Sequence, residues 1–155
     1  MDILNSQNKV IVERANAAVL SRDYTLAARL YKGLLKNSPQ DLDLLTKLGE
    51  LYVKSGNDNQ ALPYFQEIIN IDSKNINALN SLGAIYRRQK KYDESIAVLE
   101  QAVISDEENP QVFYNLGFTY KLMGKNEEAI HCFNTVVEKN PSDVLALYLF
   151  GSIYE

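Results

Sequence analysis

A short pattern recurs four times in this chain of 155 residues, at intervals of 34 residues. Each copy has a glycine with apolar residues one and four positions before it and a tyrosine three positions after it. The four glycines are Gly49, Gly83, Gly117 and Gly151. A repeat of this length predicts stacked pairs of helices, because one pair cannot bury its apolar face without a neighbouring pair. Function in such arrays usually depends on a surface shared by several repeats.

The glycines define a repeat frame that covers nearly the whole chain. Its units are 8–41, 42–75, 76–109 and 110–143, followed by a half-repeat at 144–155. The second half of each unit keeps the same interval, with small residues followed four positions later by large ones. These are Ala27, Ala61, Ser95 and Ala129, then Tyr31, Phe65, Leu99 and Phe133. With only four prolines and seven glycines there is no low-complexity linker, so we expect a single domain over 1–155.

The pattern resembles the tetratricopeptide repeat, in which Leu-Gly-x-x-Tyr is followed by Ala-x-x-x-Phe and a closing proline. Pro39 and Pro141 supply that proline in the first and fourth units. The resemblance implies an all-α, right-handed superhelical solenoid of antiparallel helix pairs. It also implies a concave groove that takes peptide segments of partner proteins.

Helical periodicity divides the first helix of each unit into two sides. At about 100° per residue, unit positions 3, 4, 7, 8, 10 and 11 share one arc, which we expect to be buried. In the second unit these positions are Leu44, Leu45, Leu48, Gly49, Leu51 and Tyr52. Glycine at position 8 is expected to let the helices of a pair approach closely, with Ala61 and its counterparts opposite.

Helix-capping residues follow the same interval. Asp41, Asn75, Asn109 and Asp143 each precede a predicted first helix, where their side chains can accept hydrogen bonds from first-turn N–H groups. Gly56 and Gly124 lie beyond the first helices of their units and suit left-handed helix ends. We expect nine helices and no strands.

Charge and composition exclude several classes of function. A net charge of −4 and a pI near 5.1 argue against a nucleic-acid binder, which needs a basic excess. Lys9, Glu13 and Arg14 interrupt any apolar run near the N-terminus, so no signal peptide is expected. No segment approaches the ~20 apolar residues of a membrane-spanning helix. We expect no membrane insertion and a cytoplasmic location.

The side of each first helix opposite the packing arc holds the candidate partner-binding residues. Tyr114, Phe118 and Tyr148 are aromatic residues outside that arc, and aromatic side chains are favoured as anchors at interfaces. They would serve equally well to complete the packing between adjacent first helices. The sequence leaves both interpretations open.

Polar residues accompany the aromatics on that side. Asn77, Asn80 and Asn115 offer both donors and acceptors to the backbone of a bound peptide. Arg87, Arg88 and Lys121 would orient its acidic groups. The alternative for each set is a solvated polar face. Together the residues predict a protein-interaction scaffold that binds a peptide segment of another protein.

The last unit of the frame has a first helix without a second. Leu147, Phe150 and Tyr154 should face a partner helix that this chain does not contain. Terminal repeats normally carry a polar outer face. The alternative function is therefore a self-associating assembly module, a homo-oligomer that docks through its C-terminal helix.

No catalytic or metal-binding pattern is found. His131 and Cys132 are adjacent on a predicted helix, so their side chains diverge and are poorly placed to hold one metal ion. Packing explains Cys132 better, and a surface position explains His131. We expect no catalytic residues, cofactor or metal ion, and hence no enzyme activity.

Overall fold

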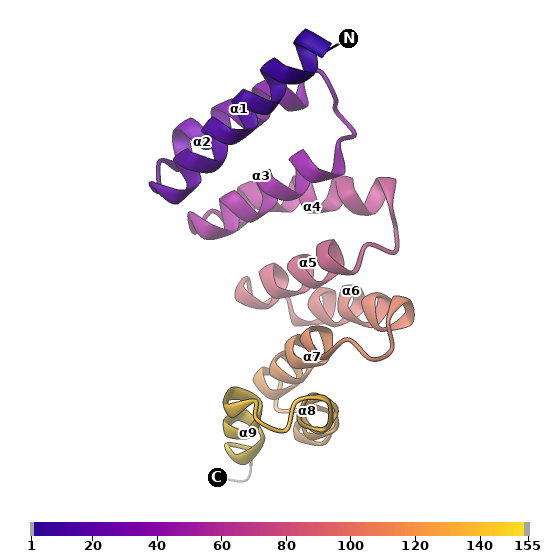
Figure 1. The fold of residues 1–155 in the computed structure, drawn as a ribbon. Coiled ribbons are helices and arrows are strands. Elements are labelled where there is room, and N and C mark those ends of the chain that lie inside the picture. The colour runs from indigo at the N-terminus through magenta and orange to yellow at the C-terminus, as the bar shows by residue number, and fades with distance from the viewer. Residues whose placement is uncertain (1, 154–155) are drawn as a thin grey trace. The chain divides into compact units, whose positions relative to one another are not determined.

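The computed structural model of the protein describes residues 2–153, with side chains from residue 6 onward (Figure 1). Within these residues every regular element is a helix. The nine helices are α1 (Asp2–Leu20), α2 (Tyr24–Leu35), α3 (Leu42–Lys54), α4 (Asp58–Ile71), α5 (Ile76–Arg88), α6 (Tyr92–Ser105), α7 (Pro110–Leu122), α8 (Asn126–Lys139) and α9 (Val144–Gly151). The all-α class and the number of helices agree with the expectation from the sequence. None of the helices in the described part is long and apolar enough to cross a membrane.

The chain divides into two compact units, residues 1–73 and 74–155. The first unit holds α1 to α4, and its helix pairs α1–α2 and α3–α4 are joined by contacts between α2 and α3. The second unit holds α5 to α9. There α5 packs on α6, α7 packs on α8, and further contacts join α6 to α7, α5 to α7 and α8 to α9. A single domain over 1–155 stays a prediction.

Helix boundaries follow the repeat frame except at its two ends. The helices α3, α5, α7 and α9 begin at residues 42, 76, 110 and 144, the first positions of their 34-residue repeats. The first helix begins at Asp2, earlier than the frame start at residue 8. The last helix was expected to fill 144–155 but ends at Gly151, because the Ile153 N–H donates to the Phe150 carbonyl three residues earlier (3.3 Å) in a tightened final turn.

The predicted N-terminal caps are confirmed. The side chains of Asp41, Asn75 and Asp143 each accept a hydrogen bond from the backbone N–H three residues later, at 3.1, 3.1 and 2.9 Å. Asn109 accepts from the Gln111 and Val112 N–H groups. Each cap satisfies a donor that has no partner inside its helix and so fixes where the helix begins.

The turn within each repeat contains one residue with left-handed backbone. Gly56 and Gly124 have φ of 75° and 73°, as predicted for these helix ends. The equivalent positions of the first and third repeats hold Arg22 and Lys90, both with φ of 61°. A side chain is strained in this conformation, whereas glycine is not.

Replacing Lys90 by glycine is therefore expected to stabilise the protein. The strain of a left-handed residue costs about 1 kcal/mol, and the added freedom of glycine in the unfolded chain offsets part of that gain. We expect Lys90→Gly to raise the free energy of unfolding in urea by about 0.5 kcal/mol. Lys91→Gly is the control, because Lys91 has φ of −88° and therefore no left-handed strain for glycine to relieve. Equal effects of the two substitutions would contradict the prediction.

The predicted buried arc is confirmed in α3, α5 and α7, whereas in α1 and α9 several of its positions, such as Val10 and Leu147, are exposed. All six predicted residues of α3 are buried. The same arc is buried in α5 and α7 except at Phe113 and at the tyrosines Tyr86 and Tyr120, which are half-buried. In the second helices the small residues and the large residues four positions later are also buried, from Ala27 and Tyr31 to Ala129 and Phe133.

The glycine at position 8 allows the two helices of a pair to approach closely. A Cβ atom added to Gly49 would lie 2.7 Å from the nearest Phe65 ring atom. The same atom on Gly117 would lie 2.8 Å from the Phe133 ring, and on Gly83 it would meet the Leu99 side chain. The large residue of the second helix therefore covers the glycine. The expected small residue also faces it in the third repeat, where the Ser95 hydroxyl donates to the Gly83 carbonyl (2.7 Å).

Candidate functional site

A buried polar network joins α5 to α7. Asn115 is only 5% exposed. Its side-chain N–H₂ donates to Asn80 Oδ1 (2.7 Å), and its Oδ1 accepts from Arg87 Nη2 (3.4 Å). Asn115 was predicted to read the backbone of a ligand, but its amide is used within the protein. The Asn115 side chain is bonded within the protein because position 6 of α7 faces α5, the neighbouring first helix.

Arg87 is the positive group at the centre of this region. Its guanidinium carbon lies 4.3 Å from the centroid of the Phe118 ring, a cation–π contact. The side chain is half-buried, and its Nε is buried without a hydrogen-bond partner among the described residues. Burial lowers the pKa of Arg87, and the neighbouring Arg88 acts in the same direction. The guanidinium nevertheless stays charged, and no carboxylate of the described residues pairs with it.

Tyr114 and Phe118 lie beside Arg87 on α7. The Tyr114 ring is tilted against the Phe118 ring at 6.5 Å between centroids and meets the Phe133 ring edge-on at 6.3 Å. Both residues are half-buried and pack against a cluster of Ala129, Phe133 and Leu149. Burial raises the pKa of Tyr114. The packing interpretation of these two aromatics therefore holds, and each keeps a part exposed to solvent.

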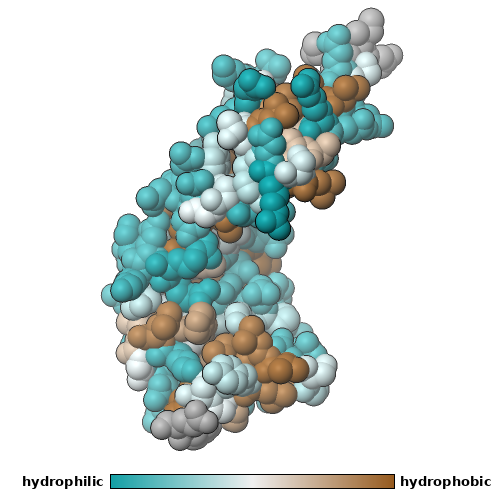
Figure 2. Space-filling model, turned by 90° about the vertical axis from the view of Figure 1, so that its left-hand side faces the viewer, coloured by the Kyte–Doolittle hydropathy of each residue, from teal (hydrophilic) through white to brown (hydrophobic). Residues whose placement is uncertain are grey.

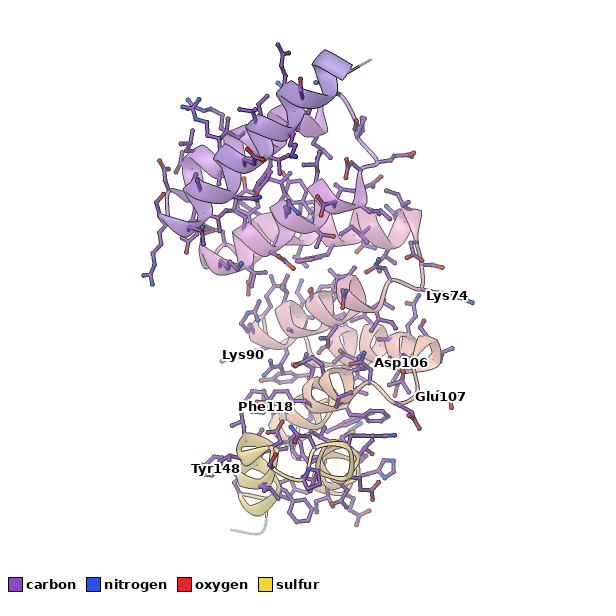
Figure 3. All side chains as sticks on the ribbon, in the orientation of Figure 1. Lys74, Lys90, Asp106, Glu107, Phe118 and Tyr148 are labelled. Atoms are coloured by element: carbon purple, nitrogen blue, oxygen red, sulfur yellow. The ribbon has the colours of Figure 1, made fainter. Side chains whose placement is uncertain are left out.

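Lys121 and Tyr148 flank this centre. Lys121 Nζ donates to Ser152 Oγ, which joins α7 to the end of α9. Tyr148 is 68% exposed on α9, and Phe118 and Tyr148 both lie on the left-hand side of the second unit in Figure 3. Arg87, Tyr114, Phe118, Lys121 and Tyr148 are called the aromatic–arginine surface below.

A depression of about 380 Å³ opens beside Tyr114. It is lined by Pro110, Gln111, Tyr114, Val136, Asn140, Asp143 and Leu145. Sequence reasoning missed the contribution of Val136 and Asn140, because they belong to the end of a second helix and carry no signal in the groove positions. Asn77 and Arg88 are exposed on α5.

The last helix exposes apolar side chains. Leu147 is 44% exposed, as the self-association hypothesis requires. Phe150 is instead half-buried and packs against the cluster of Ala129, Phe133 and Leu149 of its own chain, so part of its side chain is already covered. Tyr154 lies outside the described residues. Figure 2 shows hydrophobic residues gathered at this end of the second unit, at the bottom of the view.

Comparison with family models and solved structures places these features in a known class. A model described as tetratricopeptide repeat matches residues 18–86, one described as TPR repeat matches 83–124, and another tetratricopeptide repeat model matches 110–143. The matches follow one another along most of the repeat frame. The chain belongs to the tetratricopeptide repeat family. A search of curated proteins found no significant match.

Solved structures of tetratricopeptide repeat proteins share the fold. A crystal structure of MamA is 25% identical, with a TM-score of 0.84 over 90% of this chain and 82% of that one. YrrB, described as a TPR protein with an unusual peptide-binding site, is 24% identical, with a TM-score of 0.80 over 93% and 74% of the two chains. A tetratricopeptide repeat protein from Parabacteroides merdae ATCC 43184 is 20% identical, with a TM-score of 0.83 over 96% and 60%. The tetratricopeptide repeat class expected from the sequence is confirmed.

His131 and Cys132 were considered as a possible metal-binding or catalytic pair. Cys132 is buried and His131 is exposed, as predicted. Burial raises the pKa of Cys132 to about 12, so the thiol stays protonated and is a poor nucleophile. Among residues 2–153 no three histidine, cysteine or acidic side chains are grouped as a metal site.

Proposed function

We propose that this tetratricopeptide repeat protein is a non-catalytic scaffold that binds a peptide segment of another protein on the aromatic–arginine surface. The observation that carries the proposal is Arg87, a half-buried cation stacked on Phe118 with no carboxylate partner among the described residues. A partly buried charge without a counter-ion is costly, and a carboxylate from a partner would offset that cost. Family membership supports an interaction scaffold in general terms.

The chemistry of the surface defines the segment that would bind. The exposed Tyr148 and the half-buried Tyr114 and Phe118 offer aromatic surface to an apolar side chain, and Arg87 offers a charged hydrogen-bond donor beside them. Asn77 and Asn80 have side-chain N–H groups to donate to a peptide backbone, and Arg88 and Lys121 add positive charge. The proposed ligand is thus a segment with an acidic residue close to a large apolar one.

Selection of a displayed random-peptide library against the whole chain tests this proposal. We expect selected peptides to combine acidic and large apolar residues, and Arg87→Gln and Tyr148→Ala each to weaken their binding by about tenfold. Tyr148 is mostly exposed, so its replacement leaves the fold intact, which circular dichroism checks. The matched control is Lys54→Gln, which removes an exposed cation from the first unit. Peptides that bind both variants as tightly as the wild-type chain would contradict the proposal.

The second candidate function, self-association through α9, is favoured by one specific observation. Four large apolar side chains of this short helix are exposed: Val144 by 78%, Leu145 by 52%, Leu147 by 44% and Tyr148 by 68%. Burial of such a patch against another copy would remove it from water. Sedimentation velocity at several concentrations tests the idea. A strictly monomeric chain at every concentration would remove this candidate.

A further inference from the structure

A second and larger depression lies on a different face of the second unit, between α6, α7 and α8. Its volume is about 610 Å³, within the range of protein sites that hold ligands. Val103 and Ile104 of α6 and Phe113 and Leu116 of α7 give it an apolar lining. The rim carries three carboxylates. We call this depression the acid-rimmed groove.

The two faces of α7 serve different sites. Phe113, Leu116 and Tyr120 line the groove and follow one another at helical spacing on one side of α7. Tyr114 and Phe118 of the aromatic–arginine surface are each one or two positions away, and thus point more than 90° from that side. The groove and the surface share no residue. Occupation of one therefore leaves the other open.

The charge of the rim is negative. Glu127 and Glu128 lie in the first turn of α8, and no lysine or arginine of the described residues forms an ion pair with either. Glu100 accepts a hydrogen bond from the Tyr120 hydroxyl (3.2 Å). Lys125 is nearby, with its Nζ 5.9 Å from the Tyr120 ring. The three carboxylates of the rim therefore outnumber the nearby positive charge of Lys125, and His131 also lies at the rim.

The titratable groups within the groove do not change this balance. Burial, together with Glu100, raises the pKa of Tyr120 to about 12. Burial, together with Glu128, raises the pKa of Cys132 to about 12 as well. Both groups are neutral at physiological pH, so the groove keeps its apolar floor and its negative rim.

Ile104 distinguishes the groove from the equivalent places in the other repeats. It is 81% exposed at the edge of the apolar lining. The corresponding residues of the other repeats are Lys36, Asn70 and Glu138, all of which are polar. Ile104 therefore extends the apolar lining into a contiguous patch with a polar rim, and patches of this kind mark interaction sites.

We propose that the acid-rimmed groove binds a basic amphipathic segment of a partner protein, in which leucine or another large apolar residue is flanked by lysine or arginine. The apolar side chain occupies the groove between Ile104 and Phe113, and the flanking cations pair with Glu127, Glu128 and Glu100. Charge complementarity decides the choice of occupant, because an acidic or neutral segment would leave the rim carboxylates unpaired. This function goes beyond the proposed binding at Arg87, which prefers acidic groups.

A fluorescein-labelled helical peptide of leucine and lysine is the probe, titrated into the whole chain by fluorescence anisotropy. We expect binding that weakens as salt is raised, because part of the attraction is between exposed charges. A matched peptide has glutamate in place of lysine, and another has serine in place of leucine. Each should bind with an affinity at least about tenfold lower.

Variants of the chain locate the binding. We expect about a tenfold lower affinity for the leucine–lysine peptide in each of two variants, Ile104→Lys and the double substitution Glu127→Gln/Glu128→Gln. The matched control is Asp93→Asn/Glu94→Gln, which removes two acids from the same positions in the first turn of α6, outside the groove. Leu20→Lys, at a side chain 87% exposed in the first unit, is the control for Ile104. Arg87→Gln should leave this binding unchanged, which separates its test from that of the proposed function.

Two results would overturn the inference. Equal losses in the groove variants and in their controls would mean that the peptide is attracted by overall charge alone. Concentration-dependent dimerisation that Ile104→Lys abolishes would mean that a second copy of the chain covers the groove.

Discussion

Gly49→Ala is expected to lower the free energy of unfolding by about 1–3 kcal/mol. The added methyl group would lie 2.7–2.9 Å from three atoms of the Phe65 ring, closer than carbon atoms can approach. Phe65 is 2% exposed and packed on every side, so its ring cannot move aside without disturbing the contact between α3 and α4. Urea denaturation followed by circular dichroism measures the loss.

The control for this prediction is a glycine of the same unit that lies in open space. A Cβ atom added to Gly33 in α2 would meet nothing within 4 Å. Because alanine favours a helix interior over glycine, Gly33→Ala should raise the free energy of unfolding by up to about 1 kcal/mol. The two glycine-to-alanine substitutions therefore change stability in opposite directions. A gain at both positions would show that the close approach of Phe65 has no energetic consequence.

Asn115→Ala is expected to lower the free energy of unfolding by a similar amount, about 1–3 kcal/mol. It removes the donor that Asn80 Oδ1 uses and the acceptor that Arg87 Nη2 uses, both in partly buried surroundings. The loss is greater than that of an ordinary exposed hydrogen bond, because two polar groups remain without partners away from bulk water. Thermal and urea unfolding of the variant provide the measurement.

Asn77→Ala serves as the reference for this second prediction. Asn77 is exposed on the same helix as Asn80, so its replacement should change the stability by less than about 0.5 kcal/mol. Asn115→Asp should lower the free energy of unfolding by less than Asn115→Ala, because a carboxylate at this position would pair with the Arg87 guanidinium. If alanine and aspartate at position 115 were equally destabilising, the charge of Arg87 would have no part in the network.

Local features of the fold could be predicted from the sequence, because they depend on residues a few positions apart. The six buried residues of α3 and the caps at Asp41 and Asp143 are of this kind. The contact of Gly49 with Phe65 was not predicted, because periodicity gives the spacing along the second helix but not its rotation about its own axis. That rotation depends on how the Phe65 ring fits against the glycine.

The candidate site was predictable only in part, for a related reason. The pattern of a single helix identifies the side on which Tyr114, Asn115 and Phe118 lie, but not how closely the next first helix approaches. That spacing buries Asn115 and leaves Tyr114 and Phe118 half-buried. The acid-rimmed groove was missed because Glu127 and Glu128 have the ordinary appearance of acids that stabilise a helix N-terminus. The sequence signal for the groove was Ile104 itself, an apolar residue at a position that is polar in the other repeats.

The hydrogen bond between Asn80 and Asn115 makes two similar repeats non-interchangeable. Asn80 occupies position 5 of the third repeat, and Asn115 occupies position 6 of the fourth. The corresponding residues elsewhere are Val12, Thr46, Tyr114 and Tyr148 at position 5 and Glu13, Lys47, Ser81 and Leu149 at position 6. A chain with residues 76–109 and 110–143 exchanged would keep every glycine, cap and apolar arc of the array. It would also set the half-buried Asn80 amide opposite Leu149, whose side chain neither donates nor accepts a hydrogen bond, so the order of the repeats is itself encoded in the fold.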